Sequence, residues 1–124
     1  MNNNYFIVRD AAILTNAYVA GTVINECDSY NQLSIDCFFT IGSLTDAQIK
    51  VETSYDGTNY TQETFGAVSA GVETESLGVH KIAATGNYSI AVPLIGARYV
   101  KISAIGTGTV TNSSLKIAAR LATV

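Results

Sequence analysis

The sequence predicts an all-β protein, a single-domain antiparallel β-sandwich of about eight or more short strands. Three observations predict it. Residues 49–64 form an alternating strand, a turn and a second alternating strand. Short segments with the same alternation recur along the chain, and clusters of Gly, Asn, Asp and Ser separate them at regular intervals. A chain of 124 residues is long enough to bury roughly two thirds of its unfolded surface, so we expect one domain over residues 1–124.

The hairpin at residues 49–64 is the clearest element. Asp56 and Gly57 tolerate the backbone angles of a tight turn between the two strands. Side chains of the first strand alternate with a period of two, as in a half-buried strand. The face that we expect to be buried carries Ile49, Val51, Thr53 and Tyr55, and the other face carries Lys50, Glu52 and Ser54.

The remaining strands follow from the same alternation. In the strand at residues 33–41, the odd-numbered residues face the core and Phe38 lies on the opposite face. Residues 10–16 and 115–122 also allow a helical pattern, and for the second stretch the strand is favoured. The other expected strands are residues 5–8, 12–19, 21–24, 72–77, 80–84, 88–92, 98–105 and 114–121. The expected turns lie at residues 25–32 and 42–45, at Gly66, Gly71, Gly78, Pro93 and Gly96, and at residues 85–87, 106–108 and 112–113.

Composition excludes several classes of function. Charged residues make up 14% of the chain, against about 25% in typical soluble domains. The net charge of −3 comes without a basic stripe, which argues against nucleic-acid binding. No apolar run approaches the roughly 20 residues of a membrane helix. The N-terminus lacks the pattern of a secretory signal, so we expect synthesis in a host cytoplasm and free thiols at Cys27 and Cys37, although the two could approach across neighbouring strands.

The residues that carry chemistry are isolated from one another. His80 is the single histidine, which removes most catalytic and metal constellations. We expect it to be an exposed or half-exposed strand residue. Glu73 and Glu75 should share the exposed face of one strand, and Asp28 and Asp46 lie in expected loops without a calcium-ligand spacing. The sequence therefore predicts no catalytic residue, no metal ligand and no cofactor.

The segment from Ser54 to Tyr60 is similar to the aspartate–glycine turn of sialidase-type repeats and of discoidin-like sugar-binding sandwiches. The resemblance implies a structural role. Asp56 and Asn59 would cap backbone donors, Gly57 would supply the turn, and the aromatic ring of Tyr60 would pack beneath it.

Residues 49–60, 85–93 and 97–117 together resemble small β-sandwich virion proteins of tailed bacteriophages. The resemblance runs from about residue 33 to the C-terminus. It implies a jelly-roll or discoidin-like sandwich that serves as a head decoration, auxiliary capsid or fibre-base protein. Tyr60 stands where such proteins often have Trp, a residue that this chain lacks. Residues 1–32 match less clearly, and we interpret them as a docking arm or edge segment.

These observations lead to the hypothesis of a non-enzymatic virion protein that decorates or stabilises a capsid. Its expected partners are the major capsid protein or other virion proteins and further copies of itself, as a trimer by analogy. Phe38 and Ile105 are the expected interface residues. The alternative is a discoidin-like carbohydrate-binding module. The same turn and the seven tyrosines favour it, and the absence of Trp and of an export signal argues against it.

Overall fold

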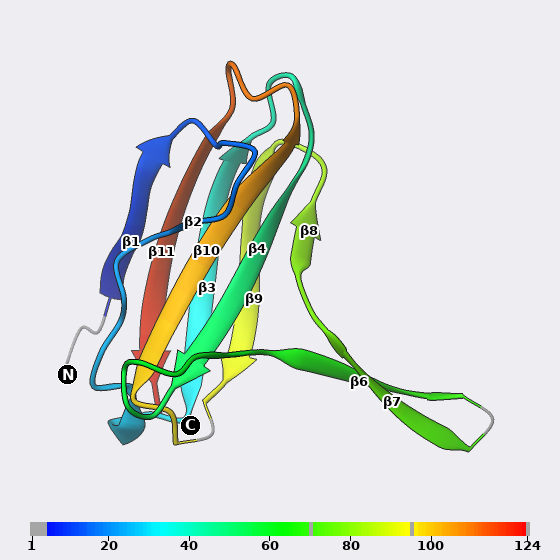
Figure 1. The fold of residues 1–124 in the computed structure, drawn as a ribbon. Coiled ribbons are helices and arrows are strands. Elements are labelled where there is room, and N and C mark those ends of the chain that lie inside the picture. The colour runs from blue at the N-terminus through cyan, green and yellow to red at the C-terminus, as the bar shows by residue number, and fades with distance from the viewer. Residues whose placement is uncertain (1–4, 70, 95, 124) are drawn as a thin grey trace.

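The computed structural model describes residues 5–69, 71–94 and 96–123, and it has two facing antiparallel sheets of four and five strands (Figure 1). The strands found among the described residues cover 60% of the chain, which confirms the predicted all-β sandwich. The helical structure among the described residues is one short 3-10 turn, Cys27–Ser29, so none of the described helices could span a membrane.

Each sheet combines strands from distant parts of the chain. The four-stranded sheet has the order β1 (Tyr5–Ala12), β11 (Ser114–Ala122), β3 (Gln32–Thr40) and β9 (Gly86–Pro93). The five-stranded sheet has the order β2 (Val19–Ala20), β10 (Tyr99–Gly108) and β4 (Leu44–Ser54), with β5 (Thr61–Gln62) and β8 (His80–Ile82) both pairing with β4. Because β3 and β4, like β10 and β11, lie in different sheets, both connections cross between the layers. They do so at the same end of the sandwich, where the Ser43 amide donates to the Asn112 side chain at 2.8 Å (Figure 1).

A two-stranded ribbon projects from the sandwich (Figure 1). It consists of β6 (Thr64–Ser69) and β7 (Val72–Leu77), which pair antiparallel along their whole length, from Thr64 with Leu77 to Ser69 with Val72. The predicted strand at residues 72–77 coincides with β7, whereas β6 had no counterpart in the sequence prediction. The side chains of the ribbon, including the expected exposed face of Glu73 and Glu75, lie outside the described residues.

The core lies between the two sheets, where alternating side chains of both meet. In β3 the inward residues are buried, as predicted, and Phe38 lies outward with 40% of its surface exposed. Residues 115–122 are a strand rather than a helix, with Leu115, Ile117 and Ala119 fully buried. Each large aliphatic side chain of this kind contributes about 1.5–3 kcal/mol relative to an exposed position.

The hairpin at residues 49–64 forms, but its turn is not tight. β4 ends at Ser54 and β5 begins at Thr61, so a six-residue loop joins them, and two residue pairs connect the strands. The predicted faces were wrong at the end of β4: Tyr55 is 69% exposed, whereas Ser54 is 1% exposed. The reason is that the Ser54 hydroxyl accepts hydrogen bonds from the amides of Asp56 and Gly57. These bonds begin the loop at Ser54, so the strand alternation does not continue to Tyr55.

Further expectations were wrong near the glycines and the N-terminus. Gly66 and residues 86–87, expected in turns, lie in β6 and β9, and the expected strand at residues 21–24 is reduced to an isolated bridge at Ile24. Residues 106–108 belong to β10 rather than to a turn, because Gly106 makes room for Leu14 and Leu44; a Cβ there would lie 3.1 and 2.9 Å from their side chains. Residues 13–18 are not part of a strand. Instead, Leu14 enters the core and Thr15 accepts a hydrogen bond from the amide of Gly106.

Candidate functional site

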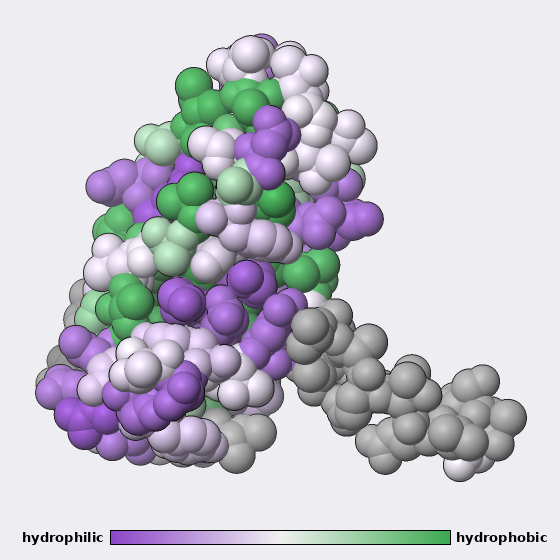
Figure 2. Space-filling view, in the orientation of Figure 1, coloured by the Kyte–Doolittle hydropathy of each residue, from purple (hydrophilic) through white to green (hydrophobic). Residues whose placement is uncertain are grey.

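Exposed apolar side chains gather at one edge of the sandwich. Nine large hydrophobic residues are exposed in the described part of the chain, and seven of them lie between residues 5 and 23. In Figure 2 apolar groups are frequent on the side where Figure 1 places β1 and β2. We call this surface the apolar edge; it consists of Tyr5, Phe6, Ile7, Ile13, Tyr18, Val19 and Val23.

The apolar edge is irregular in its backbone. The register of β1 against β11 shifts on both sides of Arg9, as at β-bulges. The Arg9 guanidinium donates to the carbonyl oxygens of Leu115, Ala12 and Ile13 at 3.1, 3.2 and 3.0 Å. These bonds satisfy main-chain carbonyl oxygens that have no partner strand where the register shifts. An edge strand of this kind is a poor template for adding a further strand.

Residues 21 and 22 tie the apolar edge to both sheets. The amide of Gly21 donates to Ile102 in β10, and the amide of Thr22 donates to Val8 in β1, at 3.0 and 2.8 Å. Beside this crossing lies a hollow of about 330 Å³ between β1 and residues 22–25, lined in part by Phe6, Ile7 and Val23. The edge therefore presents exposed apolar side chains on a backbone that is fixed at both layers.

The loop after β4 is organised around Asp56. Its carboxylate accepts hydrogen bonds from the amides of Thr58 and Asn59, both at 2.8 Å, from the Asn59 side-chain amide at 2.7 Å and from the Ser54 hydroxyl at 3.0 Å. These bonds, the one from the Asn59 amide first, hold the pKa of Asp56 well below its ordinary value. Gly57 has φ of +80°, in the left-handed region.

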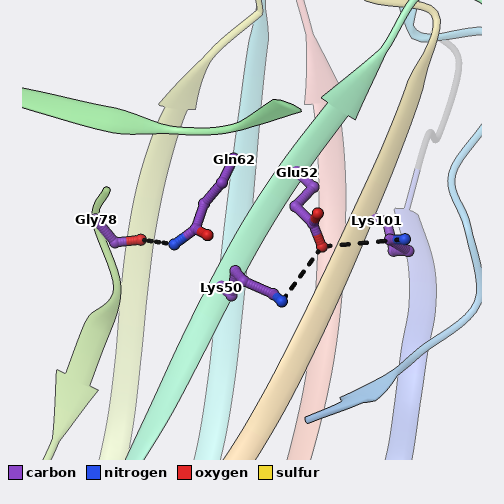
Figure 3. Close-up of polar contacts among 5 residues, drawn as sticks. All are labelled: Lys50, Glu52, Gln62, Gly78 and Lys101. Atoms are coloured by element: carbon purple, nitrogen blue, oxygen red, sulfur yellow. Dashed lines mark hydrogen bonds and ion pairs between the residues drawn. The ribbon is translucent and has the colours of Figure 1, made fainter. Parts of the chain in front are cut away.

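A polar cluster of Lys50, Glu52 and Lys101 lies on the outer face of the five-stranded sheet (Figure 3), and Tyr60 contacts it through Lys101. Glu52 lies between two lysines, 3.7 Å from Lys50 Nζ and 4.0 Å from Lys101 Nζ. Lys101 lies 4.3 Å from the centre of the Tyr60 ring, and Lys50 lies 4.4 Å from that of Tyr18. Ion pairs this close to solvent contribute about 0–1 kcal/mol each. Glu52 offsets one of the two lysine charges, so the cluster carries a net charge of one rather than a concentrated patch.

The base of the β6–β7 ribbon is held by a second set of contacts. The Gly78 amide donates to the Glu63 carbonyl at 3.0 Å, and the Gln62 side chain donates to the Gly78 carbonyl at 2.9 Å (Figure 3). His80 Nε2 lies 2.5 Å from the Glu63 carboxylate. His80 is thus half-buried and paired on a strand. A hollow of about 560 Å³ lies beside these residues and reaches Tyr55 and the end of β9, Ala91 to Pro93.

The two cysteines are buried free thiols, as predicted. Burial, with a smaller effect of Asp28, raises the pKa of the Cys27 thiol to about 11. Burial and then Asp36 raise the pKa of the Cys37 thiol to about 12. Both groups are therefore protonated near neutral pH, and a thiol rather than a thiolate is a weak nucleophile and metal ligand.

The remaining candidates of the sequence analysis are dispersed. Phe38 lies on the outer face of the four-stranded sheet and Ile105, half-buried, on that of the five-stranded sheet, so the structure does not bring them together. Asp46 is nearly buried, 4.0 Å from Lys81, and Asp28 lies 3.7 Å from Arg98. Within the described ranges, no three His, Cys, Asp or Glu residues converge as a metal site.

Comparison with known proteins identifies the architecture. No family model matches the sequence, and no curated protein matches it significantly. Among solved structures, the chain is similar to the PBSX exported protein XepA, with a TM-score of 0.66 and 10% identity over 97% of this chain and 37% of that one. It is also similar to part of tripeptidyl peptidase 2, with a TM-score of 0.54 and 11% identity over 97% of this chain and 10% of that one. At these identities the likeness concerns the fold, and this chain spans about a third of the length of XepA.

Neither the apolar edge nor the ribbon was predicted from the sequence. Residues 1–32 were interpreted as a docking arm or edge segment because their resemblance is weak, and no side chain was assigned to an interface there. A signal for the edge was present, because apolar residues occur at both parities in residues 5–8 and 18–19, whereas a half-buried strand alternates. The ribbon depends on the path of the backbone after Glu63, which composition does not indicate.

Proposed function

We propose that this chain is a non-enzymatic structural protein of a phage particle, which binds a neighbouring virion protein through its apolar edge. The observation that carries the proposal is the concentration of seven exposed large hydrophobic side chains between residues 5 and 23. Exposed apolar patches of this kind mark protein interaction sites, and aromatic residues such as Tyr5, Phe6 and Tyr18 are enriched there.

The phage assignment is supported from two directions. Residues 49–60, 85–93 and 97–117 resemble virion β-sandwich proteins of tailed phages. The fold is similar to XepA, a protein of the PBSX phage. A likeness in fold does not transfer a function by itself, and here it agrees with the direction of the sequence resemblance. The charge-poor chain, with 14% charged residues, suits a subunit that packs against many neighbours.

The apolar edge favours binding through side chains rather than by strand addition. The bulges around Arg9 disturb the outer ladder of β1, so a partner has to fit the projecting side chains. The major capsid protein is the partner that we propose first, because a decorating subunit needs a repeated surface. Self-association in a closed symmetric oligomer, for which we retain the trimer, is part of the same proposal.

The proposal is tested by binding to particles. Purified chain is mixed with undecorated shells from the phage that encodes it, and co-sedimentation is measured. Phe6→Ser with Ile13→Ser should abolish binding without unfolding the protein, since both side chains are exposed. Tyr55→Ser, an equally drastic change on a 69% exposed ring outside the apolar edge, should bind like wild type. Wild-type protein that sediments with no shell and is absent from purified particles would refute the proposal.

A carbohydrate-binding module is the second candidate, and one observation favours it. Tyr55 is highly exposed beside the hollow of about 560 Å³, whose lining also includes Gln62, Glu63 and His80. An aromatic ring next to polar groups is an arrangement that binds sugar rings. A glycan array separates the two candidates: selective binding that Tyr55→Ser removes and Phe6→Ser with Ile13→Ser preserves would favour the module.

A further inference from the structure

We infer that the protein assembles by strand addition between copies, in which β6 of one ribbon pairs with the open edge of β9 in a neighbouring copy. The inference rests on the proposed function, because it specifies how the self-association takes place. It begins from the backbone groups at the edges of the two sheets.

β9 is a long edge strand that lacks the charges and bulges that usually protect such edges, and its one protecting feature among the described residues is the terminal Pro93. Among the described residues it forms a ladder with β3, and no other strand pairs with its outer side. Its eight residues, 86–93, include no charged side chain, and the pairing shows no register shift. Proteins normally blunt edge strands with charges, bulges or short length, since open ladders recruit further strands.

The other sheet edges in the described chain are protected. β1 carries Arg9 and Asp10 and two register shifts. β2 and β5 are two residues long, and β8 is three residues long. β9 ends in Pro93, which limits an added ladder to the residues before it. β9 is therefore the edge of the sandwich that is prepared to accept a strand.

The ribbon is the complementary element. β6 and β7 pair with each other and with no third described strand, and an isolated two-stranded hairpin is marginally stable in water. β7 contains Glu73 and Glu75, whereas the six residues of β6 are uncharged. The uncharged edge of β6 matches the uncharged edge of β9 in kind and fits within its length.

A second copy is the occupant that these facts favour. The ribbon projects away from its own sandwich (Figure 1), and no described pairing joins it to its own β9. Each copy thus offers one donor ribbon and one acceptor edge. Contacts between different surfaces of identical subunits run head to tail and close into a ring when the rotation permits. The hollow at Ala91 to Pro93, next to the ribbon base, leaves room beside the acceptor edge.

The test uses two half-blocked variants of the full chain and sedimentation analysis. In the first, Ser89→Lys with Ala91→Lys charges the acceptor edge at two exposed positions. Its matched control, Ser89→Thr with Ala91→Thr, changes the same positions without charge. In the second, residues 64–77 are replaced by Asn-Gly, because Glu63 and Gly78 are already joined by a backbone hydrogen bond and a two-residue turn suits such a junction.

We expect wild type and the threonine control to form the same oligomer. Each half-blocked variant alone should be monomeric. In the lysine variant, the dissociation constant of self-association should rise about tenfold or more, because charges at the edge oppose an added strand. An equimolar mixture should form a 1:1 dimer, since one variant keeps the ribbon and the other keeps the open β9. Oligomers that persist in both variants would overturn the strand addition and leave the proposed self-association intact. A wild-type monomer at high concentration would overturn both, and loss of assembly in the ribbon variant alone would exclude β9 as the acceptor.

Discussion

The two sides of the sandwich differ in which groups they leave exposed for a partner. The apolar edge around β1 and β2 exposes side chains on an irregular backbone held by Arg9. The side formed by β9 and the ribbon leaves regular backbone edges open, without charges on β9 or β6. A surface that presents side chains selects a partner of matching shape, whereas an open ladder accepts a strand largely through its main chain.

The difference separates two tasks within one small fold. Side-chain recognition suits a heterologous partner such as a shell protein, because specificity comes from pockets and shape. Strand addition suits a second copy, because a matching strand is always supplied together with the acceptor. Changes that act on one side and spare the other therefore test the division directly.

The largest effect on stability is expected at Gly21, where the apolar edge is hydrogen-bonded to both sheets. A Cβ at residue 21 would lie 2.4 Å from the Val8 carbonyl oxygen and 2.7 Å from its Cγ1. Gly21→Ala should therefore lower the free energy of unfolding by about 3 kcal/mol, since the backbone has to move. Chemical denaturation measures the loss.

The matched glycine lies at the tip of the ribbon. Gly71 has φ of +79°, and no atom of the described part of the chain, apart from its chain neighbours, lies within 4 Å of an added Cβ. Gly71→Ala should destabilise the ribbon by about 1 kcal/mol, the cost of a left-handed conformation for alanine. The free energy of unfolding of the sandwich should stay unchanged. Equal losses at Gly21 and Gly71 would show that the two sides unfold as one unit.

The next largest effect on stability is expected at Arg9. Arg9→Ala removes three hydrogen bonds to main-chain carbonyls, and we expect a loss of about 1–2 kcal/mol in the free energy of unfolding. Arg120→Ala, on the neighbouring strand and exposed, should change it by less than about 0.5 kcal/mol. Loss of shell binding in the first variant, at temperatures where it stays folded, would show that the bulges shape the apolar edge. Unchanged stability would contradict the role of Arg9.

The sequence predicted the elements whose side chains alternate, and it failed where backbone path or close packing decides. β3 and β11 were predicted within one residue at each end because their inward residues form an uninterrupted series. Gly106 was interpreted as a turn, since a glycine that admits Leu14 is indistinguishable in sequence from one that turns the chain. Tyr55 was placed inward because the hydrogen bonds of Ser54 are not encoded in periodicity.

The candidate surfaces were predicted less well than the fold. Phe38 was correctly placed outward, yet it lies away from the apolar edge and on the sheet opposite Ile105. Residues 5–23 lack a clean period because several of their apolar residues stay exposed. An interaction surface depends on which side chains the fold leaves uncovered, and this is decided by the assembled sheets.

A smaller, pH-dependent effect is expected in the loop that leads to β5 and the ribbon. Because the pKa of Asp56 is lowered in the folded state, its ionised form stabilises the protein above its ordinary pKa of 3.8, and this contribution is lost as the pH falls below that value. Asp56→Asn should therefore lower the melting temperature at pH 7, and the difference from wild type should shrink toward pH 2. Asp10→Asn, an exposed carboxylate of β1, is the control on the other side. A difference that stayed constant with pH would contradict the role of the charge.

The last effect changes reactivity rather than stability, and it shows which side opens first. Cys27 lies in the segment that follows the apolar edge and is fixed by its amide to the Arg98 carbonyl at 2.9 Å, whereas Cys37 sits in β3 between Ile117 and Tyr88 of the two flanking strands. Local opening frees the first thiol, and the second requires the four-stranded sheet to separate. In the single-thiol variants Cys37→Ala and Cys27→Ala, a disulfide reagent should label Cys27 about tenfold faster or more, because local opening costs less than global unfolding. A bound partner on the apolar edge should slow this labelling, and ring formation at β9 should not. Equal rates for both thiols would mean that the sandwich opens as a whole, and the two sides would then be independent in binding but not in dynamics.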